Sequence, residues 1–483
     1  TKLVKDINVG IGSSSFNSQY VKVNNNWFFV AKHQGLNWSL WKTDGTTAGT
    51  LMVKDLGGIP IPPGGGSVAP ILMAAHNGLL YFGFDDQGGG LGNELWVSDG
   101  TTSGTKMVKD INPTAGSTPI GLTSMGKYLY FYANDGSKGY ELWRSNGTDT
   151  GTSMVADIYP GPIGSYPTGY PSIFVFKNKL YFGAQGTHDE GIELYESDGT
   201  GAGTKLVKDI NPNMTGSYPA FLAATSNYLI FRANDGTNGL ELWITDGTPN
   251  GTKLLKDINA GATGSTPYNA NVVGSKVVFS AADATHGTEP WVTDGTTAGT
   301  TLLKDIFTGK GSSYAGAPIQ HNGIFYFYAD DSIHGIELWQ TDGTPNGTLL
   351  NTDLNKGKSG SIVGSIISNG SSLMFSCKID KDSLGQELYI FKPVNKASIS
   401  KNTATNNEIR VYPNPVIQGQ KLTFQIDGNS PIEIAISSMD GRLTSSFTSF
   451  DKTIIIPESI GKGLYVLSIR NNSGFQNFKI QIE

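Results

Sequence analysis

The chain has little of what small disulfide-bonded or metal-binding proteins depend on. Among 483 residues there is one cysteine, Cys377, which excludes an internal disulfide framework and a cysteine-based zinc site. Charged residues make up 16% of the chain and the net charge is −6, which argues against a nucleic-acid partner because such proteins need a basic face. No apolar run approaches the roughly 18 residues that span a bilayer, so we expect no membrane-spanning segment.

Glycine and aromatic residues are abundant, and they belong to a repeat. Glu-Leu-Trp-Val-Ser-Asp-Gly-Thr at 94–101 recurs as Glu-Leu-Trp-Ile-Thr-Asp-Gly-Thr at 241–248. The aromatic residue of this motif occurs eight times, at Trp41, Trp96, Trp143, Tyr195, Trp243, Trp291, Trp339 and Tyr389. A period of about 50 residues is typical of propeller blades or solenoid repeats.

Each repeat is predicted to form four short strands, called a to d in chain order. In residues 117–158 these strands are expected at 119–124, 128–133, 140–145 and 153–158. Asn146-Gly147 lies between strands c and d, and Asp-Gly takes its place in most other repeats. Such dipeptides between β runs are a strong hairpin signal because the turn needs positive φ. The fold is therefore predicted to be all-β.

The ends of the repeat array predict a closed ring. Strand d carries an aspartate that follows seven of the eight aromatic positions, whereas Tyr389 has none after it. The missing strand is found at the N-terminus, in Lys2–Ile7 with Asp6. A linear solenoid has no reason to place part of a repeat at each end. We therefore expect residues 1–391 to form an eight-bladed β-propeller in which Lys2–Ile7 pairs with residues 387–391, leaving no open edge.

These motifs resemble the ELWxxDGT repeat family of bacterial surface proteins over residues 1–391. Three repeats depart from its pattern. Ser39 stands where Glu is usual, Pro290 stands where Leu is usual, and the eighth repeat lacks Asp-Gly-Thr. The resemblance implies a secreted or surface-exposed propeller.

A second β pattern follows a polar linker predicted at residues 392–408. Seven short strands are expected in residues 409–483, which suggests a small Ig-like β-sandwich. Four motifs occur there in order: Val411-Tyr412-Pro413-Asn414-Pro415, Met439-Asp440-Gly441-Arg442-Leu443, Gly461-Lys462-Gly463-Leu464-Tyr465-Val466 and Lys479-Ile480-Gln481-Ile482. Together they resemble the type A sorting domain of the type IX secretion system of the Bacteroidota.

That resemblance implies export of folded cargo to the cell surface, with a signal peptide removed ahead of Thr1. The implied partners are the outer-membrane β-barrel shuttle that captures such domains and the type IX translocon. The residues expected to contact them are Pro413, Asn414, Pro415, Gly441, Gly463, Tyr465, Lys479, Ile480, Gln481, Ile482 and Glu483.

Several polar positions recur in the predicted propeller. The b-to-c turns carry Asp135, Asp235, Asp283 and Asp331, each six residues before the Glu of strand c. We expect each Asp to cap its turn and each Glu to pair with the Lys of strand d, and structural calcium is the alternative. A Gly-Ser pair follows each strand d, as at Gly116-Ser117 and Gly311-Ser312. Its hydroxyl is expected to bond within the turn, and sugar binding in the channel is the alternative.

The chain shows no recognisable catalytic signature, and no cofactor or metal is expected. His188, His286 and His334 fall in equivalent b-to-c turns, where exposed turn residues are expected because neighbouring blades separate them too far to share a metal. Segments that break the repeat are better site candidates: residues 57–66, residues 85–92 and Asn37-Trp38.

Two functions are consistent with this sequence. The leading interpretation is a non-enzymatic secreted surface protein whose propeller binds glycan or protein in adhesion or gliding. The alternative is a secreted propeller enzyme acting on polysaccharide. The resemblance to Bacteroidota exported proteins also implies O-glycosylation at Asp-Ser-aliphatic triplets, here at Ser332 and Ser383, within b-to-c turns.

Overall fold

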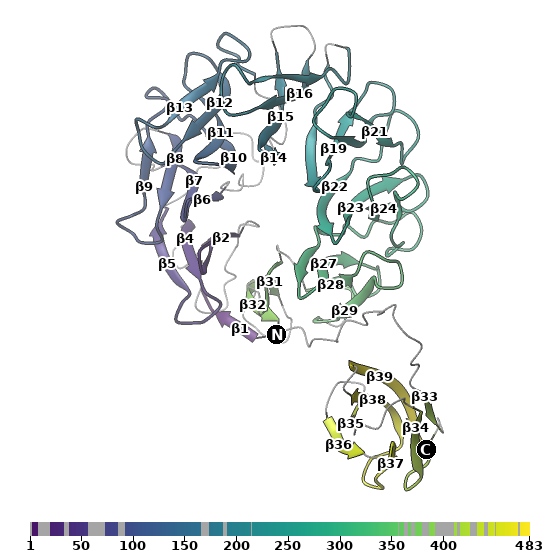
Figure 1. Ribbon diagram of the computed structural model, residues 1–483. Helices are drawn as coiled ribbons and strands as arrows, with labels where there is room; N and C mark the ends of the chain where they lie inside the picture. The colour runs from purple at the N-terminus through teal and green to yellow at the C-terminus, as the bar shows by residue number, and fades with distance from the viewer. Residues whose placement is uncertain are drawn as a thin grey trace. The chain divides into compact units, whose positions relative to one another are not determined.

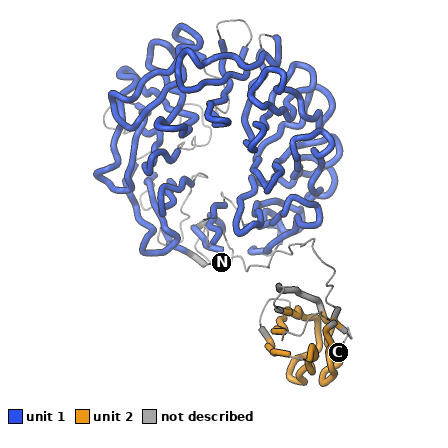
Figure 2. Tube along the Cα trace, viewed as in Figure 1, with its two compact units in different colours: residues 1–394 blue, residues 395–483 orange. Residues whose placement is uncertain are grey.

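The computed structural model describes residues 2–7, 20–32, 38–56, 73–85, 92–165, 173–186, 191–213, 215–355, 357–361, 366–368, 372–378, 386–391, 410–412, 416–425, 432–438, 443–449, 451–471 and 474–483. The chain forms two compact units, residues 1–394 and residues 395–483, which Figure 2 distinguishes by colour. Every regular element in the described part is a β-strand, and no described helix could cross a membrane.

The first unit is an eight-bladed β-propeller, as predicted. Each blade is a four-stranded antiparallel sheet, and the blades follow one another around a ring (Figure 1). Blade 1 contains β2 (Val21–Val23), β3 (Asn26–Lys32), β4 (Trp38–Thr43) and β5 (Leu51–Asp55). Blade 2 contains β6 (Met73–His76), β7 (Leu79–Asp85), β8 (Asn93–Ser98) and β9 (Lys106–Lys109). Blade 3 contains β10 (Ile120–Met125), β11 (Tyr128–Asn134), β12 (Tyr140–Ser145) and β13 (Ser153–Ala156).

The next four blades repeat this order. Blade 4 contains β14 (Phe174–Phe176), β15 (Lys179–Gln185), β16 (Ile192–Ser197) and β17 (Lys205–Lys208). Blade 5 contains β18 (Ala220–Ala224), β19 (Leu229–Asn234), β20 (Leu240–Thr245) and β21 (Lys253–Lys256). Blade 6 contains β22 (Tyr268–Val273), β23 (Lys276–Asp283), β24 (Gly287–Thr293) and β25 (Thr301–Leu302). Blade 7 contains β26 (Ile319–His321), β27 (Ile324–Asp330), β28 (Ile336–Thr341) and β29 (Leu349–Thr352).

The last blade combines the two ends of the propeller sequence. It contains β30 (Ile367–Ser368), β31 (Leu373–Lys378) and β32 (Gln386–Phe391), and its fourth strand is β1 (Lys2–Lys5). β1 runs antiparallel to β32, with Lys2 opposite Ile390 and Leu3 opposite Tyr389. The predicted closure by the N-terminal strand is therefore confirmed.

The hydrophobic core lies between neighbouring blades. The second strand of a blade is buried on both faces, as the apolar run in β11 requires. Leu95 and Val97 of blade 2 pack in one cluster with Leu129 and Phe131 of blade 3. Figure 1 shows first strands such as β10 toward the centre of the ring and fourth strands such as β9 at its periphery.

The second unit is a small β-sandwich. One sheet has the order β33-β34-β37 and the other β36-β35-β38-β39. Their bounds are β33 (Arg410–Tyr412), β34 (Lys421–Gln425), β35 (Ile432–Ser438), β36 (Leu443–Ser449), β37 (Thr453–Ile455), β38 (Gly463–Asn471) and β39 (Gly474–Ile482). Buried Leu422, Ile434, Ile436, Leu467 and Ile480 belong to a core confined to this unit.

Candidate functional site

The connections of the propeller divide between two rims. Because the four strands of a blade form an antiparallel meander, the b-to-c turns and the d-to-a connections lie at one end of each blade. The a-to-b and c-to-d turns lie at the other end. The polar residues predicted as site candidates, other than those of the Asp-Gly-Thr turns, therefore gather on the first of these rims, called here the connection rim.

A buried glutamate organises the connection rim in each of blades 2 to 7. The Glu94 carboxylate accepts hydrogen bonds from the backbone N–H of Ile111 (3.0 Å), Asn112 (3.3 Å) and Ser117 (2.9 Å), and from the Ser117 hydroxyl (2.6 Å). It therefore ties strand c to the d-to-a connection of its own blade. The equivalent side chains are also fully buried: Glu141, Glu193, Glu241, Glu289 and Glu337.

This network corrects two predictions. The glutamates do not pair with the lysines of strand d, because those lysines reach the next blade instead. Lys256 Nζ, for example, donates to the backbone oxygen of Thr300 at 2.6 Å. The serine hydroxyls bond to the glutamate rather than within their turn, and the serines are buried instead of facing the channel. In blade 6 the bonded residue is Ser313 rather than the predicted Ser312.

Burial changes the ionisation of these glutamates. It raises the pKa of Glu141 and Glu193 to about 7 and that of Glu289 to about 6, although their hydrogen bonds act in the opposite direction. Shifted carboxyl pKa values often mark catalytic acids. Here they recur in successive blades on side chains that are enclosed and saturated with backbone donors, which is the environment of a structural anchor.

The b-to-c turns are capped by aspartate, as predicted. Asp235 Oδ1 accepts from the backbone N–H of Thr237 (2.9 Å) and Asn238 (2.8 Å). In blades 6 and 7 the turn also holds a histidine, since His286 Nδ1 lies 2.8 Å from Asp283 and His334 Nδ1 lies 2.7 Å from Asp331. These contacts raise the pKa of both histidines.

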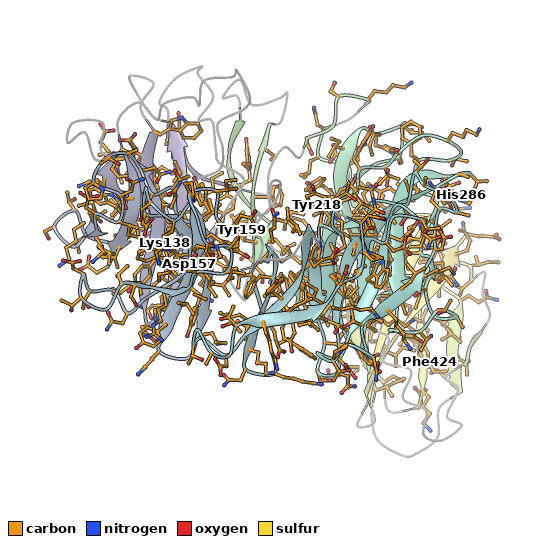
Figure 3. All side chains as sticks on the ribbon, turned by 90° about the horizontal axis from the view of Figure 1, so that it is seen from above. Lys138, Asp157, Tyr159, Tyr218, His286 and Phe424 are labelled. Atoms are coloured by element: carbon orange, nitrogen blue, oxygen red, sulfur yellow. The ribbon has the colours of Figure 1, made fainter. Side chains whose placement is uncertain are left out.

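Structural calcium, the alternative considered for these turns, requires several ligands close together. No group of three or more His, Cys, Asp or Glu side chains that could hold a metal occurs in the described ranges. In blade 3 the cation of the turn is Lys138, which pairs with Asp157 of the d-to-a connection at 2.9 Å; Figure 3 shows the two side by side. His188 lies outside the described residues.

Two buried histidines were not predicted. His76 Nδ1 lies 2.8 Å from Ser124 Oγ, and His321 Nδ1 lies 2.8 Å from Ser368 Oγ, so each links one blade to the next. Burial lowers the pKa of both rings. Each histidine ends a first strand directly before Asn-Gly, a shared context that could have distinguished them from turn histidines.

The opposite rim carries the Asp-Gly-Thr turns. Asp246 Oδ1 accepts from the backbone N–H (2.8 Å) and the hydroxyl (2.7 Å) of Thr248. A β-carbon at Gly251 would overlap the Asp246 carboxylate, which explains the second glycine of the repeat. These turns also bond to the preceding blade, as when Thr102 Oγ1 donates to Val53 O at 2.8 Å.

Exposed aromatic side chains occur where the d-to-a connections approach the first strands. Tyr218 and Tyr314 follow the buried serines of the connection rim and are 42% and 63% exposed. Figure 3 places Tyr218 toward the middle of the view, with Lys138 and His286 farther out on either side.

The predicted candidate segment 57–66 and most of 85–92 lie outside the described residues, as does Asn37. Trp38 begins β4 and packs beside the core of blades 1 and 2.

The sorting-domain candidates occupy different environments. Ile480 and Ile482 are fully buried in the core, and Glu483 is exposed. Lys479 pairs with Val466 and Gln481 with Leu464 in the β38–β39 ladder, where Gly463 begins β38. The Tyr465 hydroxyl donates to the Gly461 carbonyl at 2.8 Å. Pro413, Asn414, Pro415 and Gly441 lie outside the described residues.

The last residues pair with the connection between β33 and β34. Val416 N donates to Gln481 O at 2.9 Å, Glu483 N donates to Val416 O at 3.0 Å, and Gln418 N donates to Glu483 O at 3.2 Å. The C-terminus is therefore part of the fold of this unit.

One of the two predicted glycosylation sites can be placed. Ser332 lies in the exposed β27–β28 turn at φ 69°, and its N–H donates to Asp330 Oδ1 at 2.7 Å. Ser383 lies outside the described residues.

Comparisons with known proteins identify the second unit. Residues 410–483 match the model of the secretion system C-terminal sorting domain. No curated protein matches the chain. Among solved structures, the chain is similar to a prolyl endopeptidase (12% identity, TM-score 0.45), covering 96% of this chain and 55% of the endopeptidase.

Two further structures are similar at the same low identity. PorZ, an essential bacterial surface component of the type IX secretion system of Porphyromonas gingivalis, has 12% identity and a TM-score of 0.37, over 98% of this chain and 71% of PorZ. The β-propeller domain of the trilobed protease from Pyrococcus furiosus has 12% identity and a TM-score of 0.41, over 71% of this chain and all of that domain. The family match shows that residues 410–483 form a C-terminal sorting domain of the type IX secretion system, which indicates a secreted or cell-surface protein.

Proposed function

We propose that this chain is a non-enzymatic surface protein in which the sorting domain directs export and the propeller binds a glycan or a surface protein. The outer-membrane β-barrel shuttle and the translocon of the type IX system are the proposed partners of residues 410–483. Adhesion or gliding is the proposed role of the propeller. The observation that carries the proposal is the union of a matched sorting domain with a closed propeller that exposes aromatic side chains on one rim.

The export half of the proposal has a direct test. Because the sandwich has its own core, residues 395–483 fused to a neutral reporter are expected to carry it to the surface of a type IX-competent cell. The matched control is the same fusion ending at residue 478, which removes buried Ile480 and Ile482 together with the pairing of the last residues with the β33–β34 connection. Surface reporter from the control at the level of the intact fusion would contradict the proposal.

The binding half is tested on the full chain. Purified protein is expected to retain glycans or surface proteins from the producing organism while releasing no reducing sugar from the polysaccharides it is given. The carboxyls to substitute when testing the rival, a polysaccharide-degrading enzyme, are Glu141 and Glu193, whose pKa values burial raises. Release of reducing ends that is lost in Glu141→Gln or Glu193→Gln, with the fold preserved, would establish the rival instead.

A further inference from the structure

One position on the connection rim holds non-glycine residues in left-handed backbone conformation in every blade where it is described. It follows the buried serine that bonds to the rim glutamate. The residues and their φ angles are Thr118 (48°), Tyr218 (49°), Thr266 (46°) and Tyr314 (48°). Left-handed φ is uncommon for threonine and tyrosine and strains the backbone of both.

The scaffold imposes this conformation. The N–H of the residue is held by the start of strand c in the preceding blade, as when Thr118 donates to Asn93 O at 2.8 Å and Thr266 to Leu240 O at 2.9 Å. A glycine would adopt the same φ without strain. This chain uses glycine at many other positive-φ positions, including the neighbouring Gly216 and Gly264. A threonine or tyrosine at this strained position therefore indicates that its side chain has a role that glycine could not fill.

These residues lie shortly before the first strands of the blades. Tyr218 lies two residues before β18 and Tyr314 lies five before β26, and the first strands face the centre of the ring (Figure 1). Burial raises the pKa of Tyr268, and electrostatic interaction with Tyr314 and Tyr328 raises it further. A β-carbon at Gly316 would contact the Tyr328 ring, so the backbone after Tyr314 is seated against it.

We propose that Tyr314 and Tyr218 are stacking platforms for the pyranose rings of a neutral oligosaccharide, with Thr266 supplying a hydroxyl between them in blade order. Tyrosine combines a flat apolar face with a hydroxyl, and threonine hydroxyls both donate and accept, which matches a sugar ring and its substituents. In the blades where it is described, this position carries either a tyrosine ring or a threonine hydroxyl and no aliphatic side chain. The inference rests on the proposed binding function and specifies its ligand and its site.

The test uses the full chain and three probes: hexaoses of β-1,4-linked glucose, β-1,4-linked mannose and β-1,4-linked N-acetylglucosamine. Binding is measured by isothermal titration calorimetry, and stability by urea unfolding. The variants are Tyr314→Asn, Tyr218→Asn and Tyr314→Phe, because asparagine tolerates left-handed φ and phenylalanine keeps the ring. Ile163→Ala is the matched control, since Ile163 is a 72% exposed apolar side chain in a d-to-a connection.

We expect at least one hexaose to bind, Tyr314→Asn and Tyr218→Asn each to weaken it about tenfold or more, and Tyr314→Phe and Ile163→Ala to change it less than threefold. The asparagine variants are expected to unfold at the same or a higher urea concentration, because they relieve strain. A lower midpoint would show that the tyrosines are kept for packing and would overturn the inference.

Two other outcomes separate this inference from the proposed function. Glycan binding that survives both asparagine substitutions would overturn the tyrosine site and leave glycan binding by the propeller standing. A wild-type chain that binds none of the hexaoses but captures a surface protein would overturn the glycan inference and leave the surface-binding function standing.

Discussion

The strand that closes the propeller gives the sharpest test of the fold. Ile7 and Val4 of the N-terminal segment are 5% and 4% exposed, and they pack in one cluster with Phe29 and Trp41 of blade 1 and Leu388 of blade 8. Two side-chain hydrogen bonds tie the segment to blade 1: Lys5 Nζ donates to Thr50 O, and Thr47 Oγ1 donates to Val4 O, each at 2.7 Å. The N-terminal strand is thus built like the fourth strand of an interior blade.

Ile7→Ala is expected to lower the free energy of unfolding by about 2–5 kcal/mol, the range for truncating a fully packed isoleucine. Ile111 occupies the equivalent position after β9 and is also 5% exposed, so Ile111→Ala is expected to match it within about 1 kcal/mol. Leu51→Ala is the control on an exposed side chain of strand d and is expected to change stability by less than about 0.5 kcal/mol.

Urea unfolding followed by tryptophan fluorescence measures all three variants, with Trp41 reporting on the same cluster. Deleting residues 1–7 is expected to expose the edge of β32 and to produce soluble oligomers or aggregates in size-exclusion chromatography. An Ile7→Ala loss below about 0.5 kcal/mol beside a full loss for Ile111→Ala would refute closure by this strand.

The remaining predictions concern the polar networks and the modification site. Burial raises the pKa of Glu141 and Glu193 from 4.5 in the unfolded chain to about 7 in the folded one. Their contribution to the free energy of unfolding is therefore greatest below pH 4.5 and declines as pH rises through 7. The urea midpoint of the wild type is therefore expected to fall more steeply between pH 5 and pH 8 than that of Glu141→Gln/Glu193→Gln, and equal slopes would contradict the shift. Gly251→Ala is expected to destabilise by about 1–2 kcal/mol by displacing Asp246, and by less in an Asp246→Ala background; additive effects in this double-mutant cycle would rule out the overlap. Native protein is expected to show added hexose-type mass that Ser332→Ala with Ser383→Ala removes, and an unmodified intact mass would exclude glycosylation.

The number of blades, the closing strand and the sorting domain could be predicted from the sequence because each is marked by a recurring or ordered motif. The eight aromatic positions predicted eight blades, and the aspartate of Lys2–Ile7 identified the missing strand. The four ordered motifs identified the sorting domain, because each stands in fixed order within a short segment. These features are local, so they can be read without knowing which residues meet in space.

The partners of the polar residues were less predictable. Simple alternation placed the glutamate of strand c opposite the lysine of strand d, but the pairing of β8 with β9 shifts register between Leu95 and Trp96. Such a bulge changes which residues face each other, so the glutamate reaches the d-to-a connection and the lysine reaches the next blade. Spacing could have found Ser313, which lies eight residues after Asp305, as Ser265 does after Asp257.

The strained position illustrates a further limit. Positive φ is invisible in Thr-Pro or Tyr-Pro, since both dipeptides favour extended backbone. Only the structure shows that Tyr218, before Pro219, is left-handed and exposed. In the sequence this position is marked by a recurring threonine or tyrosine directly after the serine of the d-to-a connection, where glycine or asparagine would be expected for positive φ.

The connection rim contains two kinds of residue: glutamates and serines that recur from blade to blade, and a neighbouring position whose residue type varies. In blades 2 to 7 the carboxylate of Glu94 or its equivalent bonds to the two backbone amides that follow strand d and to the serine hydroxyl, which fixes where the next residue lies. The hydrogen bonds described at this position use the backbone N–H of that next residue, as for Thr118, Tyr218 and Thr266. Threonine in blades 3 and 6 and tyrosine in blades 5 and 7 then stand on equivalent, rigid backbone positions. The proposed sugar ligand, where it touches several blades, would meet this pattern of rings and hydroxyls on equivalent backbone positions.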